Sequence, residues 1–366
     1  MDQDLQTKAK KYSKQKYILT ILEIVYSAGL IVLFLSLGIS RGIADFLRNV
    51  IKNNFVVICV YVFFVTFTYS ILSFPINLYR SFILEHKFNL SAQSFKNWFG
   101  DFLKSLIISC LLFLILTEAF YFILHRFPYF WWLVVAVFWI LFSVVLTKLT
   151  PVLIIPLFFK YKTVADVALK ERIRKLAAKM GIKILDVYQI DFSKKTHKAN
   201  AGFVGIGRTR RVILADTLKD KYNDDEIEVI LAHEFAHYRQ KHLIKLILIN
   251  SFFIFVLLYL IFKSSNFVLN AFKLGSLSDI ANLPIILFYT IIFNVILAPF
   301  VNAISRKFER EADSLSIKFT GAREAFVSVM QKLAQQNLAD TSPNKWIKWF
   351  FFDHPPIQER IKMAEG

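Results

Sequence analysis

The chain has 366 residues, of which 56% are hydrophobic and 39 are phenylalanine. A soluble domain is usually about 45–50% apolar, so this composition excludes an ordinary soluble protein and indicates a membrane protein. The formal net charge of +18 would suggest a nucleic-acid partner in a soluble protein. In a membrane protein, basic residues gather on the cytoplasmic side, and we expect no nucleic acid here.

Six segments are apolar over the length that a membrane-spanning helix needs, about 20 residues. They are, roughly, Tyr17–Leu37, Phe55–Phe74, Leu106–Leu124, Tyr129–Leu149, Leu243–Phe262 and Leu283–Val301. Between the first two, Arg41–Ile51 is predicted to be a short amphipathic helix. The spans divide the chain into residues 1–150 with spans one to four, a globular block at 151–242, a transmembrane hairpin at 243–301 and a C-terminal block at 302–366.

The block between spans four and five has the pattern of an α/β fold. Ala165–Met180 has helical spacing, and Gly181 is suited to end that helix. A second helix is expected to start at Asn223, because Asn223 and Glu226 form a capping-box pattern before an apolar run. Short strands joined by polar turns are predicted between the two helices, at residues 183–192, 200–207 and 211–218.

An even number of spans places both termini and both globular blocks on the same side of the membrane. The start of the chain is rich in lysine, at Lys8, Lys10, Lys11, Lys14 and Lys16. Because basic residues near membrane spans favour the cytoplasm, we expect this side to be cytoplasmic.

The segment LAHEFAHY at residues 231–238 carries the main chemical signature of the chain. His233 and His237 are four residues apart and share one helical face, so their imidazoles can bind one zinc ion. Glu234 can then take a proton from the water that zinc activates, as in the H-E-x-x-H pattern. The alternative is a chance pattern, which we expect in roughly 1 in 200 chains of this composition.

A catalytic zinc site usually has three protein ligands and one open position, so a third ligand must come from elsewhere. The best source is residues 302–319, where Asn302, Glu309 and Asp313 share a helical face with Arg306 beside them. We expect Glu309 to be the ligand and Asp313 to accept the free N–H of a zinc-bound histidine. Arg306 is expected to balance the carboxylates.

The order of the spans explains how His237 and Glu309, which are far apart in sequence, can meet. The helix with His237 runs almost directly into span five, and span six runs directly into the helix with Glu309. An antiparallel hairpin of the two spans would bring both helices to the same membrane face. The alternative is a solvated charged helix at 302–319, and Glu311 and Glu324 are rival ligands that lie off the predicted face.

At these residues the chain resembles the CAAX prenyl protease 1 family, the Ste24-type integral-membrane zinc metalloproteases. It shares a broader pattern with the HtpX-type membrane proteases. HEFAH corresponds to the family's H-E-x-x-H, and NAISRKFEREAD corresponds to its N-x-x-S-R-x-x-E-x-x-A-D segment, whose first glutamate, the third ligand, is Glu309 here. The family's S-N-A-x-F element, its R-I-V-L-x-D-T-L strand and its closing D-H-P-P-x-x-x-R-I motif have counterparts at residues 200–203, 211–218 and 353–361.

The resemblance implies a transmembrane all-α bundle that encloses a chamber. The bundle would be capped by a mostly helical, gluzincin-type zinc protease domain with a small β-sheet. The family usually has seven spans, and this chain has six, with the shortfall before Phe74. A second departure is Gly202, where the family commonly has an aromatic residue. The short chain is compatible with a bacterial member, which favours the bacterial cell membrane; a eukaryotic member would lie in the endoplasmic reticulum membrane.

Roles follow for the remaining residues that match the family's motifs. Asn200, Ala201 and Gly202 are expected to form an edge strand to which a substrate peptide adds by backbone hydrogen bonds. His354 is expected to hydrogen-bond the substrate carbonyl or the oxyanion, and Arg360 to bind a carboxylate, either of the substrate or of Asp353. The alternatives are an ordinary strand and turn for the first set and a structural turn histidine for His354.

We therefore predict a zinc-dependent endopeptidase of the membrane with one Zn²⁺ per chain and its site on the cytoplasmic side. Its expected partners are membrane lipids and peptide or protein substrates, which include lipidated ones if the chain processes prenylated C-a-a-X proteins. An HtpX-like quality-control protease is the alternative. A transporter or scaffold with structural zinc is a weaker one, because structural zinc sites normally have four protein ligands. No oligomer is implied.

Overall fold

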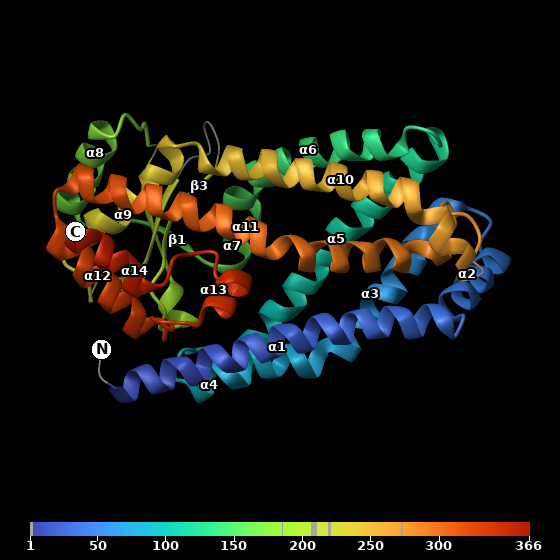
Figure 1. The fold of residues 1–366 in the computed structure, drawn as a ribbon, viewed down its shortest axis with the longest axis horizontal. Helices are drawn as coiled ribbons and strands as arrows, with labels where there is room; N and C mark the ends of the chain where they lie inside the picture. Colours follow the sequence, from blue (N-terminus) through green and yellow to red (C-terminus); the bar gives the residue numbers. More distant parts are fainter. Residues whose placement is uncertain (1–2, 185, 206–210, 219–220, 272–273) are drawn as a thin grey trace.

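The computed structural model describes residues 3–184, 186–205, 211–218, 221–271 and 274–366 (Figure 1). Long helices extend from one end of the molecule, and a smaller globular domain of helices and strands lies at the other. Residues 185 and 206–207 of the predicted strands lie outside the described ranges.

Six helices in the described part of the chain are long and apolar enough to cross a membrane, as predicted. They are built on α1 (Gln3–Ser36), α3 (Asn54–Leu78), α5 (Phe95–Arg126), α6 (Trp131–Leu149), α10 (His242–Ala271) and α11 (Leu283–Thr320). α3 continues through η1 (Tyr79–Ile83) into α4 (Leu84–Lys87), and α6 continues through η2 (Thr150–Ile154) into α7 (Ile155–Phe158). The predicted amphipathic helix is α2 (Ile39–Val50), which connects α1 to α3.

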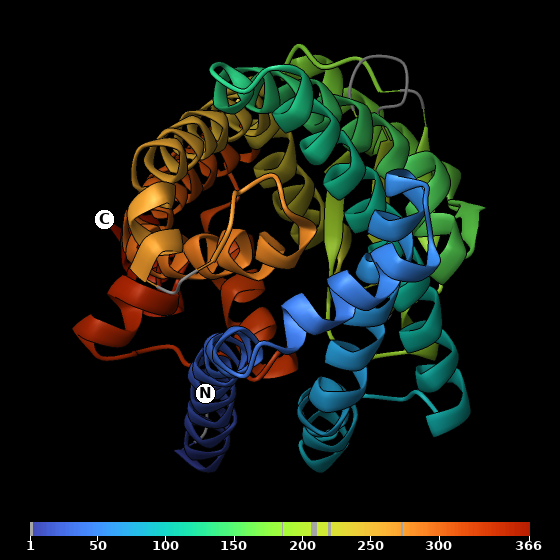
Figure 2. The same cartoon turned by 90° about the vertical axis from the view of Figure 1, so that its right-hand side faces the viewer.

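Seen end on, the long helices stand around a ring (Figure 2). Contacts follow the ring from α1 to α11, α10, α6, α5 and α3. α1 closes the ring against α3, where Tyr26 donates to the carbonyl of Leu72 at 3.0 Å and Ser27 lies 2.9 Å from the Tyr69 hydroxyl. This closed arrangement confirms the predicted bundle of transmembrane helices.

A cavity of about 740 Å³ lies between α5, α6, α10 and α11. Most of its wall is apolar, and its polar lining residues are Thr117, Ser143, Asn250, Ser251, Thr290, Asn294 and Asn302. The last of these stands where α11 leaves the predicted span. The cavity therefore reaches along α11 toward the globular domain.

The globular domain, residues 159–239 and 302–366, contains a four-stranded sheet in the order β1-β2-β4-β3. Its strands are β1 (Tyr161–Thr163), β2 (Val187–Ile190), β3 (Ala201–Val204) and β4 (Arg211–Ala215). β2 and β4 are parallel, whereas β1 and β3 pair antiparallel with them as the two edges. The strands predicted from the three apolar runs are present, and the three-residue β1 was not predicted, because it is too short to show an alternating pattern.

Helices from both globular blocks complete the domain. They are α8 (Val167–Lys179), α9 (Asp224–Arg239), α12 (Arg323–Gln336), α13 (Lys345–Phe351) and α14 (Ile357–Glu365), with short η3 (Phe192–Lys194) and η5 (Asp216–Leu218). One hydrophobic core joins the blocks, since Leu176 and Phe235 of the first lie in the same cluster as Ala312, Phe326 and Ala364 of the second. The residues before span five and after span six thus fold together.

Local sequence features fix the ends of the helices that carry the site. Asn223 caps α9: its side chain accepts from the Glu226 amide at 2.9 Å, and the Glu226 carboxylate accepts from the Asn223 amide at 2.9 Å. This is the predicted capping box, and Gly181 follows α8 with φ +72°, as expected of a helix stop. Lys241, with φ +56°, lies between α9 and α10.

α11 differs from α9 and α10 in being one helix from the membrane into the globular domain. Pro299 lies inside it, ten residues before Glu309. Proline has no backbone N–H, so one hydrogen bond of the helix is missing at this point.

Candidate metal centre

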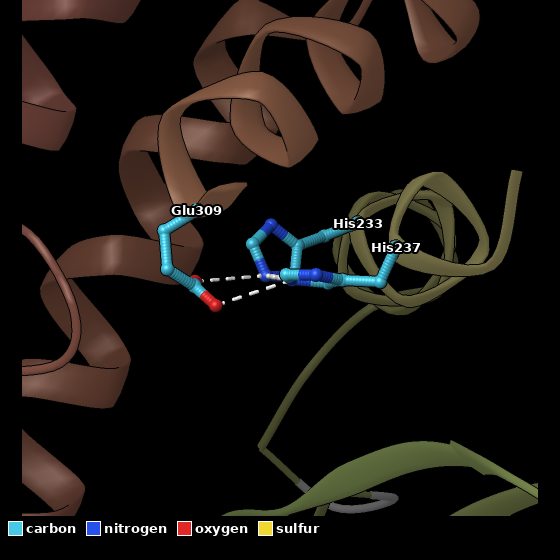
Figure 3. Close-up of side chains that lie close together, drawn as sticks. All are labelled: His233, His237 and Glu309. Atoms are coloured by element: carbon cyan, nitrogen blue, oxygen red, sulfur yellow. Dashed lines mark hydrogen bonds and ion pairs between the residues drawn. The ribbon is translucent and has the colours of Figure 1, made fainter. Parts of the chain in front are cut away.

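Three side chains from two helices converge in the globular domain (Figure 3). His233 and His237 extend from α9 and Glu309 from α11, and the Nε2 atoms of the two histidines are 3.0 Å apart. Glu309 Oε2 lies 3.2 Å from His233 Nε2, and Glu309 Oε1 lies 3.2 Å from His237 Nε2. The structure thus brings together the three residues that the sequence singled out.

The arrangement has the donor set and spacing of a metal site. Each of the three residues offers one ligand atom, and these atoms lie within 4.8 Å of one another. Ligands held at about 2.0–2.1 Å in a tetrahedron would be roughly 3.3 Å apart, close to the separations seen here. Glu309 Oε2 is also buried and, in the described part of the chain, has no hydrogen-bond partner besides its 3.2 Å contact with His233 Nε2. A cation would satisfy this oxygen, so the residues fit a metal ion.

His233 is held from behind by a buried ion pair. Its Nδ1 lies 2.9 Å from Asp313 Oδ1, and Asp313 is fully buried. Arg360 donates to both oxygens of Asp313, through Nε at 2.8 Å and a terminal nitrogen at 2.5 Å. Because Nδ1 faces a carboxylate, it carries the proton of the neutral ring and leaves the Nε2 lone pair directed at the centre.

His237 is held by a chain of rings that the sequence did not reveal. Its Nδ1 lies 3.0 Å from Nδ1 of His242, and His242 Nε2 lies 3.1 Å from Glu311 Oε2. The His242 ring stacks on Phe308, with 4.3 Å between ring centroids and 8° between planes. His242 follows His237 by five residues, and this spacing was the only signal in the sequence for the contact.

Nearby carboxylates raise the pKa values of His233 and Arg360. Burial lowers the pKa of His233, but the contacts with Asp313 and Glu309 outweigh it and raise the pKa to about 9. Binding of a metal ion to this ring therefore competes with its protonation. Burial also disfavours the charge on Arg360, but Asp313 outweighs it and raises the pKa of the guanidinium above its ordinary value.

A cavity of about 400 Å³ opens beside the three residues. Glu234 and His233 line it from α9, His354 lines it from the loop before α14, and Asn200 and Ala201 line it from the end of β3. Its remaining wall is largely apolar, with Val229, Ile230, Val329, Met330 and Leu333 among the lining residues. A group bound here would face the Glu234 carboxylate, the candidate ligand His233 and an edge strand together.

β3 has an edge position in the described sheet, because it pairs only with β4. Gly202 lies in this strand, and a Cβ added to it would meet only Val204 Cγ1, at 3.9 Å. No close contact at this position requires glycine, and the space beside the strand is open. Phe203, the next residue, packs edge-on against Phe235 of α9 and Tyr238.

His354 lies at the rim of the centre. Its Nε2 is 3.4 Å from Glu309 Oε1, and its Nδ1 is 2.8 Å from Asp353 Oδ1. Desolvation lowers the pKa of His354, but Asp353 and Glu309 outweigh it and raise the pKa above its ordinary value. The Asp353 contact places the proton on Nδ1 and orients the ring toward the centre.

The chain matches two family descriptions that together cover nearly all of it. Residues 165–366 match peptidase family M48, and residues 1–160 match the CAAX prenyl protease N-terminal region of five membrane helices. The chain belongs to peptidase family M48. In the described part of residues 1–160 of this M48 peptidase, four helices reach span length.

Individual proteins agree with this assignment. The M48 peptidase is 30% identical over 363 residues to the uncharacterized metalloprotease YhfN of Bacillus subtilis, which covers 98% of this chain and 84% of that protein. It is 28% identical over 314 residues to CAAX prenyl protease 1 of Saccharomyces cerevisiae, over 80% of this chain and 68% of that protein. The crystal structure of S. mikatae Ste24p has the same fold, with a TM-score of 0.89 and 22% identity over 100% of this chain and 90% of that one.

These relationships confirm the family and fold predicted from the sequence. The M48 peptidase is a membrane metalloendopeptidase of the Ste24 and CAAX prenyl protease type, which acts on peptide or protein substrates. It is an integral membrane protein that uses a metal ion.

Two predicted contacts differ in the structure, and Asn302, on the same predicted face, has a partner that was not predicted. Arg306 does not pair with the carboxylates, because its guanidinium donates to the carbonyls of Lys348, at 3.1 Å, and Phe352. Asn302 likewise donates to the Phe350 carbonyl, at 2.6 Å. Arg360 was predicted to bind Asp353 or a substrate carboxylate, but it binds the buried Asp313 instead. Each contact joins α11 to the C-terminal segment, whose position against α11 cannot be inferred from sequence spacing.

Proposed function

We propose that the M48 peptidase is a zinc-dependent endopeptidase with one Zn²⁺ per chain, held by His233, His237 and Glu309. The observation that carries the proposal is the convergence of the three ligand atoms, 3.0–3.2 Å apart, beside a cavity that Glu234 also lines. Two imidazoles and one carboxylate are the donor set of a zinc peptidase that keeps one coordination position for the reaction.

Bound zinc would act as a Lewis acid on the scissile carbonyl and lower the pKa of the attacking water. Glu234, on the cavity wall, takes the proton of that water and returns it to the leaving amine. His354, as the imidazolium that its raised pKa favours, donates from Nε2 to the carbonyl oxygen as negative charge develops on that oxygen. The free edge of β3 holds the substrate backbone by strand addition, with Asn200, Ala201 and Gly202 beside the cavity.

The decisive variant is Glu234→Gln, with Glu228→Gln on the same helix as the matched control. Glu228 binds Arg172 at 2.6 Å, away from the centre. Glu234→Gln should keep one zinc per chain and lose at least about 100-fold in kcat, because general-base catalysis contributes that much or more. Glu228→Gln should keep both zinc and activity. Retained proteolysis in a zinc-loaded, metal-clean Glu234→Gln preparation would refute the mechanism.

We further propose that the substrates are membrane-associated polypeptides, lipidated ones included, and that the site faces the cytoplasm. The support for membrane substrates is the apolar cavity of about 740 Å³, which reaches along α11 to Asn302. The support for orientation is the lysine-rich start of α1, on the side of the globular domain. Similarity to a bacterial relative over nearly the whole chain favours the bacterial cell membrane over the endoplasmic reticulum.

Prenyl recognition is tested with a farnesylated C-a-a-X peptide and its unprenylated twin, each with and without a chelator. Preference for the farnesylated peptide supports C-terminal processing like that named for the yeast relative. Equal cleavage of both peptides supports the alternative of a membrane-protein quality-control protease. Chelator should abolish both reactions in either case.

A further inference from the structure

α13 exposes two tryptophans on a helix of only seven residues, with the sequence KWIKWFF. Trp346 is 77% exposed and Trp349 is 46% exposed, and their rings meet edge-on with 6.2 Å between centroids. Tryptophan is highly buried on average, so two exposed rings side by side need a partner. Lys345 and Lys348 alternate with them along the helix.

Contacts with two membrane helices fix the level of α13. Asn302, the first residue after the predicted span of α11, donates to the Phe350 carbonyl at 2.6 Å. Tyr17, the first residue of the predicted span of α1, stacks on Phe351 with 5.0 Å between ring centroids. Figure 1 shows α13 at the junction between the globular domain and the long helices. The helix therefore lies where both spans leave the bilayer.

We propose that α13 is a lipid-contact helix whose tryptophans insert into the bilayer interface next to α1 and α11. Exposed apolar side chains of both spans begin beside these contacts, at Ile18 and Ile21 on α1 and at Phe300 on α11. Indole rings prefer the headgroup level of a membrane, and the exposed Lys345 would attract anionic lipids there, whereas Lys348 pairs with Glu359 at 2.5 Å. The occupant is thus the surface of the membrane that the chain itself spans.

The same contacts connect α13 to the catalytic loop. α13 ends at Phe351, and the chain then runs through Phe352 and Asp353 to His354. Arg306 donates to the carbonyl of Phe352 and so links this run to α11. Lipid contact at α13 therefore holds the loop that carries His354; this second step rests on the proposed function, whereas the lipid contact does not.

The depth of α13 in the membrane is measured on the full chain, reconstituted in nanodiscs of phosphatidylethanolamine and phosphatidylglycerol. Cys59→Ser and Cys110→Ser remove the two free cysteines so that a label attaches only at the chosen position. A nitroxide is attached at Trp346→Cys, at Glu171→Cys on α8 as the aqueous control, and at Leu248→Cys on α10 as the lipid control. Leu248 is 61% exposed within a predicted span, and Glu171 is exposed on the globular domain. At position 346, relaxation by oxygen should exceed relaxation by a polar nickel chelate and approach the lipid control.

Two results would overturn the lipid contact. A label at 346 that behaves like the label at 171 would place α13 in water. Protection from both reagents would mean that protein covers it, either a second copy or another chain. Because this readout needs no catalysis, it is unaffected if the proposed peptidase function fails.

The coupling to His354 is tested with Trp346→Ser and Trp349→Ser combined. In nanodiscs, kcat/KM should fall about tenfold while zinc content stays unchanged, because displacement of a positioning group costs rate. The control is Phe267→Ser, which removes a 78% exposed aromatic ring near the far end of α10 and should leave the rate unchanged. An unchanged rate in the double variant, or an equal loss in the control, would overturn the coupling.

Discussion

The two histidines of the centre are supported in contrasting ways. Behind His233 stands a fixed charge pair, the fully buried Asp313 and the two-pronged Arg360. Behind His237 stands a second imidazole, His242, which leads to Glu311, a side chain that is 36% exposed. Rigid ionic support inside the core orients one ring, while a chain of hydrogen bonds that ends in solvent orients the other. Loss of Asp313 should therefore cost more stability and metal affinity than loss of His242 or Glu311.

The largest effect is expected from Asp313→Asn. The variant leaves Arg360 buried without its counter-charge, so stability should fall by about 3–5 kcal/mol. Metal affinity should fall by about 10- to 100-fold, because the amide no longer orients His233 as a carboxylate does. Thermal unfolding in detergent measures the first effect, and competition with a chromogenic zinc chelator measures the second.

A double variant separates these two losses. Asp313→Asn combined with Arg360→Met removes the unpaired charge and should regain stability without regaining metal affinity. If affinity returns as well, the carboxylate acts only through folding, and the contrast between the two supports is wrong.

An intermediate effect is expected from His242→Phe. Phenylalanine keeps a flat ring against Phe308 but offers His237 no hydrogen-bond acceptor. Metal affinity should fall by about tenfold, and chelator competition would show it. His125→Phe is a suitable control, because His125 Nδ1 hydrogen-bonds the Tyr121 carbonyl in the last turn of α5, far from the centre. No loss of affinity in His242→Phe would remove His242 from the support of His237.

The smallest effect is expected from Glu311→Gln. The amide oxygen can still accept from His242 Nε2, and the lost charge is partly exposed and screened by salt. Metal affinity should change by less than about threefold, with the difference shrinking at high ionic strength. A loss as large as that of Asp313→Asn would show that both supports depend on a fixed charge.

Sequence alone predicted the parts of the molecule that depend on local pattern. The six spans follow from the length of their apolar runs. The capping box at Asn223 and Glu226 and the shared helical face of Glu309 and Asp313 follow from fixed offsets along a helix. The meeting of His233 with Glu309 also followed, because adjoining membrane helices constrain where their ends lie.

What sequence missed depends on contacts between segments far apart in the chain. Arg360 on α14 could have paired with any of several carboxylates, and only the packing of α14 on α11 selects Asp313. The partners of Arg306 and Asn302 are backbone carbonyls, which carry no sequence signal at all. The His242 contact depends on the left-handed turn at Lys241, which lets the chain leave α9 and begin α10.

Pro299 gives α11 a point at which it can bend, and neither α9 nor α10 contains a proline. Glu309 follows it by ten residues, which is about 15 Å along a helix. A bend of roughly 10° at the missing hydrogen bond would swing Glu309 sideways by roughly 3 Å, more than the length of a metal–oxygen bond. A tilt of the membrane-spanning part of α11 about Pro299 would therefore change the distance between the Glu309 carboxylate and the two imidazoles.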